Sequence, residues 1–292
     1  MIKRIVIERL LIFFIGIPAI IIMVLFLPFC RNLIMNIVTI FFSAIGALEF
    51  SAMLEKKQIR VSKIESVILG MLAPVASTLT VSLNFPGWTG PALIMAGAGW
   101  ALISGVFSRA SGIESAINRL AGYFSVMIYP GVFMYWLVKM NAWEKPEAVL
   151  LFLFIAFGND SVAWLAGTLF GANNRGIIPV SPNKSIAGFI GGLIGSTVVT
   201  AGAALLFPFV FSGLSGCVSY GKLLFWAIIL GFCTGIAATL GDLAESAIKR
   251  SCDFKDSGKL MMGRGGVLDS IDSIAVAAPV FYLLYNLLFL RF

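Results

Sequence analysis

Paired acidic residues carry the first chemical signal in this sequence. Asp242 and Glu245 are three residues apart, and Asp269 and Asp272 repeat that spacing. Residues three apart share one face of a helix, so each pair would present two carboxylates together. Converging carboxylates repel each other unless a cation lies between them. Carboxylate ligands without His or Cys suit Mg²⁺ or Mn²⁺, so the sequence predicts such a site, with a second cation as a further candidate.

The absence of histidine limits the chemistry. None of the 292 residues is histidine. No step can therefore use an imidazole base, a histidine metal ligand or a Ser-His pair. Carboxylates, lysines, arginines, hydroxyl groups and a bound metal remain available.

Basic residues and glycines lie between the two acidic pairs. The basic residues are Lys249, Arg250, Lys255, Lys259 and Arg264. Gly263, Gly265 and Gly266 surround the last of them in a glycine turn (residues 263–266). Taken separately, the basic residues fit a loop retained in the cytoplasm, and the glycines fit an ordinary turn. Together with the acids they predict a cradle for a polyphosphate.

A second polar segment begins at Asn159 and Asp160 and ends at residues 181–185. An acid that interrupts an apolar run is a functional candidate, because charge is costly next to lipid. Gly167 and Gly171 follow at a spacing that lets helices approach closely, and we expect them to serve packing. Glu49 also lies within an apolar run, where a structural role and a functional role are equally open.

The composition predicts an all-α, polytopic membrane protein. Hydrophobic residues make up 59% of the chain and charged residues 12%, against about 25% charged residues in soluble domains. A soluble globular enzyme and a disordered chain are thereby excluded. A membrane-spanning helix needs about 20 mostly apolar residues. We expect a helical bundle of about nine such spans: 10–30, 33–54, 64–83, 90–108, 120–138, 147–169, 187–211, 222–241 and 273–290.

The basic residues predict the orientation of these spans. With the N-terminus in the cytoplasm and alternating spans, most of the 21 lysines and arginines fall on the cytoplasmic side. The longest polar segments, about 170–186 and 242–272, fall there too, so we expect the active site on the cytoplasmic face. The net charge of +7 then reflects basic loops near anionic lipid, and no nucleic-acid partner is expected.

We expect one integral membrane domain over residues 1–292. Within it, residues 1–145 are predicted to be scaffold helices and residues 146–292 to form the catalytic half. The four cysteines lack the spacing of a metal or disulfide framework and are expected to act as small apolar side chains.

Three ordered motifs resemble the phosphatidate cytidylyltransferase family. Residues 246–272, called here the signature segment, read S-A-I-K-R-S-C-D-F-K-D-S-G-K-L-M-M-G-R-G-G-V-L-D-S-I-D. The family pattern is S-x-x-K-R, four residues, K-D-x-G, a glycine-rich turn and D-R-x-D, and the register holds without a gap. Residues 159–171 are similar to N-D-x-x-A-Y-x-x-G-x-x-x-G, and residues 181–188 to S-P-x-K-T-x-x-G. The first half of the chain is similar to the family only in hydropathy.

The resemblance implies that CTP and phosphatidic acid react to give CDP-diacylglycerol and pyrophosphate, with Mg²⁺ as cofactor. The implied metal ligands are Asp242 and Asp269, supported by Asp272 and Glu245. The implied catalytic residues are Asp242, Lys249, Arg250, Lys255 and Asp256. The implied substrate-binding residues are Asn159, Asp160, Ser181, Lys184, Ser246, Arg264, Gly265 and Gly266. A multi-pass protein of the bacterial inner membrane and a homodimer are also implied.

Four positions depart from the family pattern. Arg264 stands where His is usual, Ser270 where Arg is usual, Met262 where Pro is common and Ala187 where Glu is usual. We hypothesise that the charge missing at Ser270 has moved to Arg264 in the same loop. The alternatives are a divergent homologue without activity, a cytidylyltransferase for another lipid phosphate, a CTP-dependent polyprenol or phytol kinase, and an ion-coupled transporter.

Overall fold

The computed structural model describes residues 12–104, 106, 116–176, 178–211, 219–261 and 265–290, and all regular elements in these ranges are helical. This confirms the all-α prediction. The elements are η1 (Ile12–Gly16), α2 (Ile17–Phe26), α3 (Phe29–Lys56), α4 (Lys63–Ser82), α5 (Thr89–Ile103), α6 (Ala116–Val126), η3 (Met127–Val132), α7 (Phe133–Met140), η4 (Asn141–Trp143), α8 (Pro146–Phe170), α9 (Ile186–Leu206), η5 (Pro208–Phe211), α10 (Tyr220–Ser251), α11 (Leu268–Tyr285) and η6 (Asn286–Leu290).

Within the described part of the chain, seven of the nine expected spans are helices of sufficient length and hydropathy to cross a membrane. They are Phe29–Lys56, Lys63–Ser82, Ala116–Trp143, Pro146–Phe170, Ile186–Leu206, Tyr220–Ser251 and Leu268–Leu290. The other two, expected at 10–30 and 90–108, correspond to shorter apolar helices at Phe14–Phe26 and Thr89–Ile103. The chain is therefore a multi-pass membrane protein.

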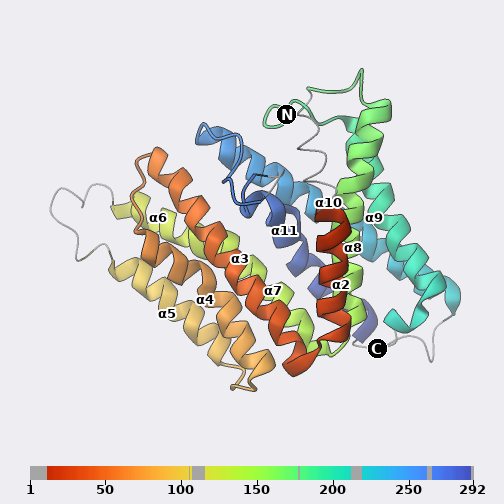
Figure 1. The fold of residues 1–292 in the computed structure, drawn as a ribbon, viewed down its shortest axis with the longest axis horizontal. Coiled ribbons are helices and arrows are strands. Elements are labelled where there is room, and N and C mark those ends of the chain that lie inside the picture. The colour runs from red at the N-terminus through yellow and green to blue at the C-terminus, as the bar shows by residue number, and fades with distance from the viewer. Residues whose placement is uncertain are drawn as a thin grey trace. The chain divides into compact units, whose positions relative to one another are not determined.

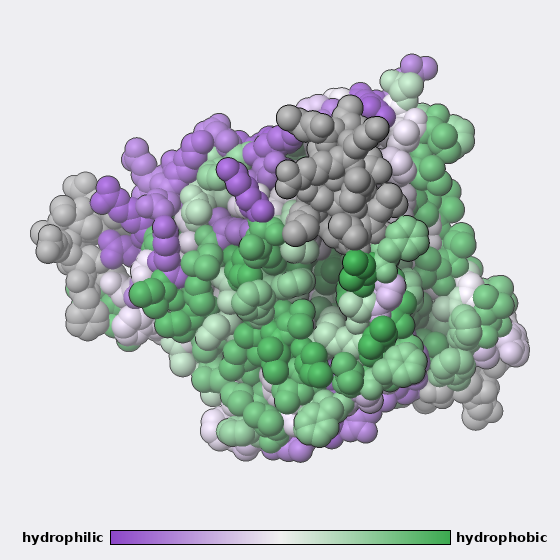
Figure 2. All heavy atoms as spheres, in the orientation of Figure 1, coloured by the Kyte–Doolittle hydropathy of each residue, from purple (hydrophilic) through white to green (hydrophobic). Residues whose placement is uncertain are grey.

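Apolar side chains cover the outward sides of these helices. Phe41, Ile194 and Leu283 are each more than half exposed. Figure 2 shows hydrophobic residues along the sides of α3 and α4, and hydrophilic residues gathered where α3 ends, including the exposed Lys56 and Lys57. Such surfaces are unfavourable in water but suit a bilayer, where each helix satisfies its own backbone hydrogen bonds.

The chain forms two compact units (Figure 1). The first contains residues 1–144 and 249–271, and the second contains residues 145–248 and 272–292. The boundaries fall within α10 and α11 and just before α8. Part of the signature segment therefore belongs to the same unit as the N-terminal helices. The assignment of scaffold and catalytic roles to the two halves stays a prediction.

Small residues let the helices of the first unit approach closely. A β-carbon on Gly131 in η3 would lie 2.6 Å from the carbonyl oxygen of Gly70 in α4. A β-carbon on Gly70 would overlap that of Ala47 in α3. The hydroxyl of Ser43 donates to the Gly70 carbonyl at 2.8 Å and also contacts the carbonyl of Pro130. These contacts fix α3, α4 and η3 side by side.

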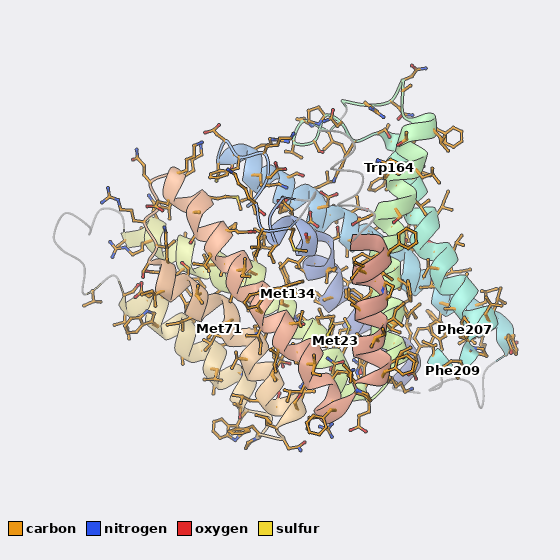
Figure 3. All side chains as sticks on the ribbon, viewed as in Figure 1. Met23, Met71, Met134, Trp164, Phe207 and Phe209 are labelled. Atoms are coloured by element: carbon orange, nitrogen blue, oxygen red, sulfur yellow. The ribbon has the colours of Figure 1, made fainter. Side chains whose placement is uncertain are left out.

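The second unit uses the same principle between α8 and α9, which run together in Figure 1. A β-carbon on Gly195 would lie 2.7 Å from the side chain of Val162, and one on Gly167 would lie 3.6 Å from the α-carbon of Gly188. The predicted packing role of Gly167 is thus confirmed. Trp164, which Figure 3 labels on α8, is 65% exposed and lies away from this contact.

We expect Gly131→Ala to destabilise the protein, because its methyl group would press against the Gly70 carbonyl. Overpacking of this kind typically costs about 1–3 kcal/mol. Gly99→Ala in α5 is the matched control, since nothing lies within 4 Å of a β-carbon there. Thermal unfolding in detergent should show a lower midpoint for Gly131→Ala and an equal or higher one for Gly99→Ala. Equal midpoints for Gly131→Ala and the wild type would contradict the close packing.

Candidate active site

The α10–α11 connection (residues 252–267) folds against the end of α3 in the first unit. The ammonium group of Lys56 lies 5.1 Å from the centre of the Phe254 ring. Lys57 and Asp253 form an ion pair at 3.7 Å, with both side chains largely exposed to solvent. These contacts bring part of the signature segment against α3, a helix that lies outside all three sequence motifs.

Glu49 of α3 contacts this connection and the start of α11 through both of its carboxylate oxygens. Its Oε1 accepts the backbone N–H of Val267 at 3.0 Å, and its Oε2 accepts that of Leu268 at 2.9 Å. The hydroxyl of Ser257 lies 3.0 Å from Oε2. The first N–H groups of a helix lack partners within the helix and carry partial positive charge, so a carboxylate stabilises the start of α11.

Asp269, in the first turn of α11, is held on several sides. Its Oδ2 accepts the backbone N–H of Gly266 at 2.7 Å and that of Ser257 at 2.8 Å. Its Oδ1 pairs with the ammonium group of Lys249, and the two side chains are only 7% and 12% exposed. A charge pair this buried persists because each partner and the surrounding N–H groups offset the loss of water.

Two glycines of the described part of the turn, Gly265 and Gly266, stand where a side chain would not fit. Gly265 has φ +105°, which side-chain-bearing residues rarely adopt. Gly265 also exchanges two backbone hydrogen bonds with Met261, at 2.9 and 3.1 Å, which closes the turn. A β-carbon on Gly266 would overlap the Ser257 hydroxyl and the Glu49 carboxylate. The predicted substrate-binding residue Arg264 lies outside the described residues.

The remaining candidates of the first unit lie at its surface. Arg250 donates from Nη1 to the carbonyl oxygen of Phe254 at 3.2 Å, and its side chain is exposed. Lys255 and Asp256 are exposed as well. These groups can therefore meet a charged partner from solution, whereas Lys249 and Asp269 are held inside.

In the second unit, Lys184 pairs with Asp242 of α10, and each side chain is about one-third exposed. The turn before α9 positions this lysine: Lys184 N–H donates to the Ser181 carbonyl at 3.0 Å. Ser185 then caps α9 by accepting the Gly188 N–H at 3.0 Å. The motif at residues 181–188 thus forms a turn and the start of α9. It places the ammonium group of Lys184 beside the carboxylate of Asp242 in α10.

Two carboxylates of this unit, those of Asp160 and Asp272, lie next to the buried Ser273. Its hydroxyl lies 3.2 Å from Asp272 Oδ1 and 3.4 Å from both carboxylate oxygens of Asp160. One hydroxyl proton can serve only one of these carboxylates at a time. Two carboxylates this close favour a nearby positive charge.

Three further predicted residues lie on α8 and α10 of the second unit. Asn159 is buried, donates to the Gly235 carbonyl at 3.1 Å and accepts from the Thr239 hydroxyl at 3.2 Å. It therefore joins α8 to α10. Glu245 is fully buried, and Ser246 is half-buried.

The predicted metal ligands divide between the units: Asp269 belongs to the first, and Asp242, Glu245 and Asp272 to the second. Within the described ranges, no three Asp, Glu, His or Cys side chains gather as a metal-binding group. The donors that are present are carboxylate and hydroxyl oxygens. Their chemistry fits a hard cation such as Mg²⁺, which commonly takes only one or two carboxylates and completes its shell with water and phosphate.

Neither Glu49 nor Ser257 is among the site residues that the sequence predicts. A usable signal existed for Glu49, because an acid within an apolar span needs partners. Ser257 carried no such signal. Its role follows from the fold, which places its hydroxyl 2.9 Å from Asp269 and 3.0 Å from Glu49, a residue 208 positions away in the chain.

Comparison with known proteins places this geometry in context. A sequence model described as "Cytidylyltransferase family" matches residues 7–288. A phosphatidate cytidylyltransferase of Haemophilus influenzae is 41% identical over 140 residues, which cover 47% of this chain and 45% of that protein. One of Thermotoga maritima is 33% identical over 178 residues, covering 60% and 62%, respectively. One of Helicobacter pylori is 32% identical over 154 residues, covering 52% of each. The chain thus spans about half the length of the curated relatives it matches.

We expect Gly266→Ala to open the α10–α11 connection, because the added methyl group would displace Ser257 and Glu49. Hydrogen exchange measured by mass spectrometry should be faster across residues 256–270 in this variant. Gly221→Ala is the control, since the nearest atom to a β-carbon there is 4.0 Å away. Unchanged exchange across 256–270 in Gly266→Ala would show that the turn does not depend on this close approach.

Proposed function

This chain belongs to the cytidylyltransferase family, and we propose that it transfers CMP from CTP to phosphatidic acid, giving CDP-diacylglycerol and pyrophosphate. The observation that carries the proposal is the buried Lys249–Asp269 pair beside the glycine turn. It provides a fixed cation, a fixed carboxylate and close backbone approach within one segment. The names of the relatives supply the substrate class.

The proposed reaction depends on reducing the repulsion between negatively charged phosphates more than on proton transfer. An oxygen of the lipid phosphate attacks the α-phosphorus of CTP, the bond to the bridging oxygen breaks, and pyrophosphate leaves with that electron pair. The attacking phosphate is already anionic at pH 7, so no general base is required, which suits a chain without histidine. The barrier then comes mainly from repulsion and positioning, which fixed cations lower.

In the first unit, the basic side chains are proposed to bind phosphate groups. Lys249 would present a charge whose position is set by Asp269, while the exposed Arg250 and Lys255 would approach the nucleotide from solution. The turn at Gly265 and Gly266 would let the triphosphate lie close to the backbone, because neither residue projects a side chain.

In the second unit, Lys184 is proposed to hold a phosphate beside Asp242. Asp242, Glu245 and Asp272 are the proposed oxygen ligands for Mg²⁺, and the carboxylate of Asp160 next to Asp272 supports a cation there. When bound, the cation would offset repulsion between the attacking phosphate and the triphosphate. Asn159 and Ser181 are proposed to line the pocket, and Asp269 remains a ligand predicted from the sequence.

The proposed setting is the bacterial inner membrane, with the site on the cytoplasmic face and the acyl chains of phosphatidic acid in the bilayer. Two ion pairs of the first unit agree with the alternation of spans on which this orientation is based. Arg31 and Glu144, both expected outside, pair at 2.8 Å, while Lys57 and Asp253, both expected inside, pair at 3.7 Å. A homodimer is proposed on the family resemblance.

Product analysis tests the activity directly. Purified protein given CTP, Mg²⁺ and phosphatidic acid should form CDP-diacylglycerol and pyrophosphate, identified by mass spectrometry and a pyrophosphate assay. Asp269→Asn should reduce this conversion by at least about a hundredfold, because it removes the charge that holds Lys249. Glu55→Gln, at the exposed end of α3, should retain activity. Formation of CDP with a phosphorylated lipid would instead identify a kinase, and full activity of Asp269→Asn would contradict the assigned role.

Thiol labelling tests the orientation. Cys30 is exposed near the start of α3, and Lys57 follows its other end. In a background without other cysteines, an impermeant maleimide added to intact spheroplasts should label Cys30, whereas Lys57→Cys should require permeabilised membranes, as the positive-inside rule predicts. The reverse pattern would contradict the proposed cytoplasmic face.

A further inference from the structure

We propose that Glu49 is a positioning residue for the reaction, although it lies outside the signature segment and in the N-terminal half of the chain. Its carboxylate holds the α10–α11 connection and the start of α11 in the arrangement that Lys249 and Asp269 require. This inference rests on the proposed function for its effect on turnover, but not for its effect on the connection itself.

Both oxygens of Glu49 face hydrogen-bond donors. Oε1 accepts from Val267, and Oε2 accepts from Leu268 and lies within reach of the Ser257 hydroxyl. Only an ionised carboxylate offers two acceptor oxygens without a proton of its own. Glutamine at this position would place an NH₂ group against backbone N–H groups. The contact therefore requires the two acceptor oxygens of a carboxylate, and not only a side chain of this size.

Ser257 links Glu49 to Asp269. Its hydroxyl lies 3.0 Å from Glu49 Oε2 and 2.9 Å from Asp269 Oδ2, and it accepts the Asp269 N–H at 3.2 Å. Because Asp269 in turn pairs with Lys249, a displacement of Glu49 would reach the proposed phosphate-binding lysine through three successive contacts, by way of Ser257 and Asp269.

The surrounding backbone is shaped to admit the Glu49 carboxylate. A β-carbon on Gly258 or on Gly266 would overlap one of its oxygens. Among the described residues, Lys56 at the end of α3 and Lys57 just after it also reach the connection, through the Phe254 ring and Asp253, but both lysines are exposed. Exposed pairs contribute little to stability. The backbone hydrogen bonds of Glu49 therefore make the stronger of the contacts described here between α3 and the segment before α11.

The test compares Glu49→Gln and Glu49→Asp with Glu55→Gln. Glu49→Gln keeps the side-chain size and removes the charge, and Glu49→Asp keeps the charge but shortens the reach. Glu55→Gln is the matched control, since it makes the same change on the same helix at an exposed position. Two readouts are measured: the kcat and KM for CTP, and the rate at which a maleimide labels Cys252.

Cys252 reports opening of the connection independently of activity. It is a free thiol, only 4% exposed, at the start of the connection. Labelling of a buried thiol follows the population of locally open molecules. The measurement uses a background in which the other three cysteines, Cys30, Cys217 and Cys233, are replaced by alanine.

For Glu49→Gln we expect Cys252 to be labelled at least about tenfold faster, the size of effect that follows from losing one charge-assisted hydrogen bond. The kcat should fall by at least about tenfold with little change in KM, because misplacing groups that act in the transition state lowers turnover more than binding. Glu49→Asp should give intermediate values for both readouts, and Glu55→Gln should match the wild type.

Wild-type labelling and wild-type kcat in Glu49→Gln would overturn the proposal. If that variant cannot be purified, Glu49→Asp decides in the same way. A fall in kcat with unchanged labelling of Cys252 would also overturn it, because the effect would then not pass through the connection. If the wild-type protein makes no CDP-lipid, the proposed function fails, and the labelling rates still decide whether Glu49 holds the connection.

Discussion

A carboxylate away from bulk water must be surrounded by donors, and this constraint organises the first unit around the start of α11. Glu49 and Asp269 together accept backbone N–H groups of Ser257, Gly266, Val267 and Leu268. These are N–H groups that a helix start and its preceding turn would otherwise leave without partners. The acids are therefore stabilised by the same segment that they hold in place, and Lys249 is fixed by Asp269 as a consequence.

The same arrangement suits a reaction between two anions. A chain without histidine cannot run its chemistry through an imidazole, and attack by a lipid phosphate on CTP does not ask for one. What such a reaction needs is positive charge held in place before the substrates arrive. Lys249 in the first unit and Lys184 in the second are both held by a carboxylate, and Arg250 is exposed at the surface of the first unit.

Among the described residues, hydropathy correctly predicted seven of the nine expected spans, because a bilayer-spanning segment must be long and apolar wherever it packs, while the other two spans correspond to shorter apolar helices. The spacing of Gly167 likewise predicted a close helix contact, which the structure confirms. The signature segment identified Asp269 and Lys249 as candidates, but they lie 20 positions apart, and their pairing depends on how the residues between them fold. The sequence marks Glu49 as an acid that needs partners, but it does not identify them. The partners lie about two hundred residues away, and hydropathy does not determine which loop packs against which helix.

The proposed role of Glu49 requires that Glu49 and Ser257 act together to hold the α10–α11 connection. A double-mutant cycle measures this most directly: hydrogen exchange across residues 256–270 is compared in the wild type, Glu49→Gln, Ser257→Ala and the double variant. The double variant should open little more than either single variant, with a coupling energy of about 1 kcal/mol or more. Fully additive effects would show that the two residues act independently and would contradict it.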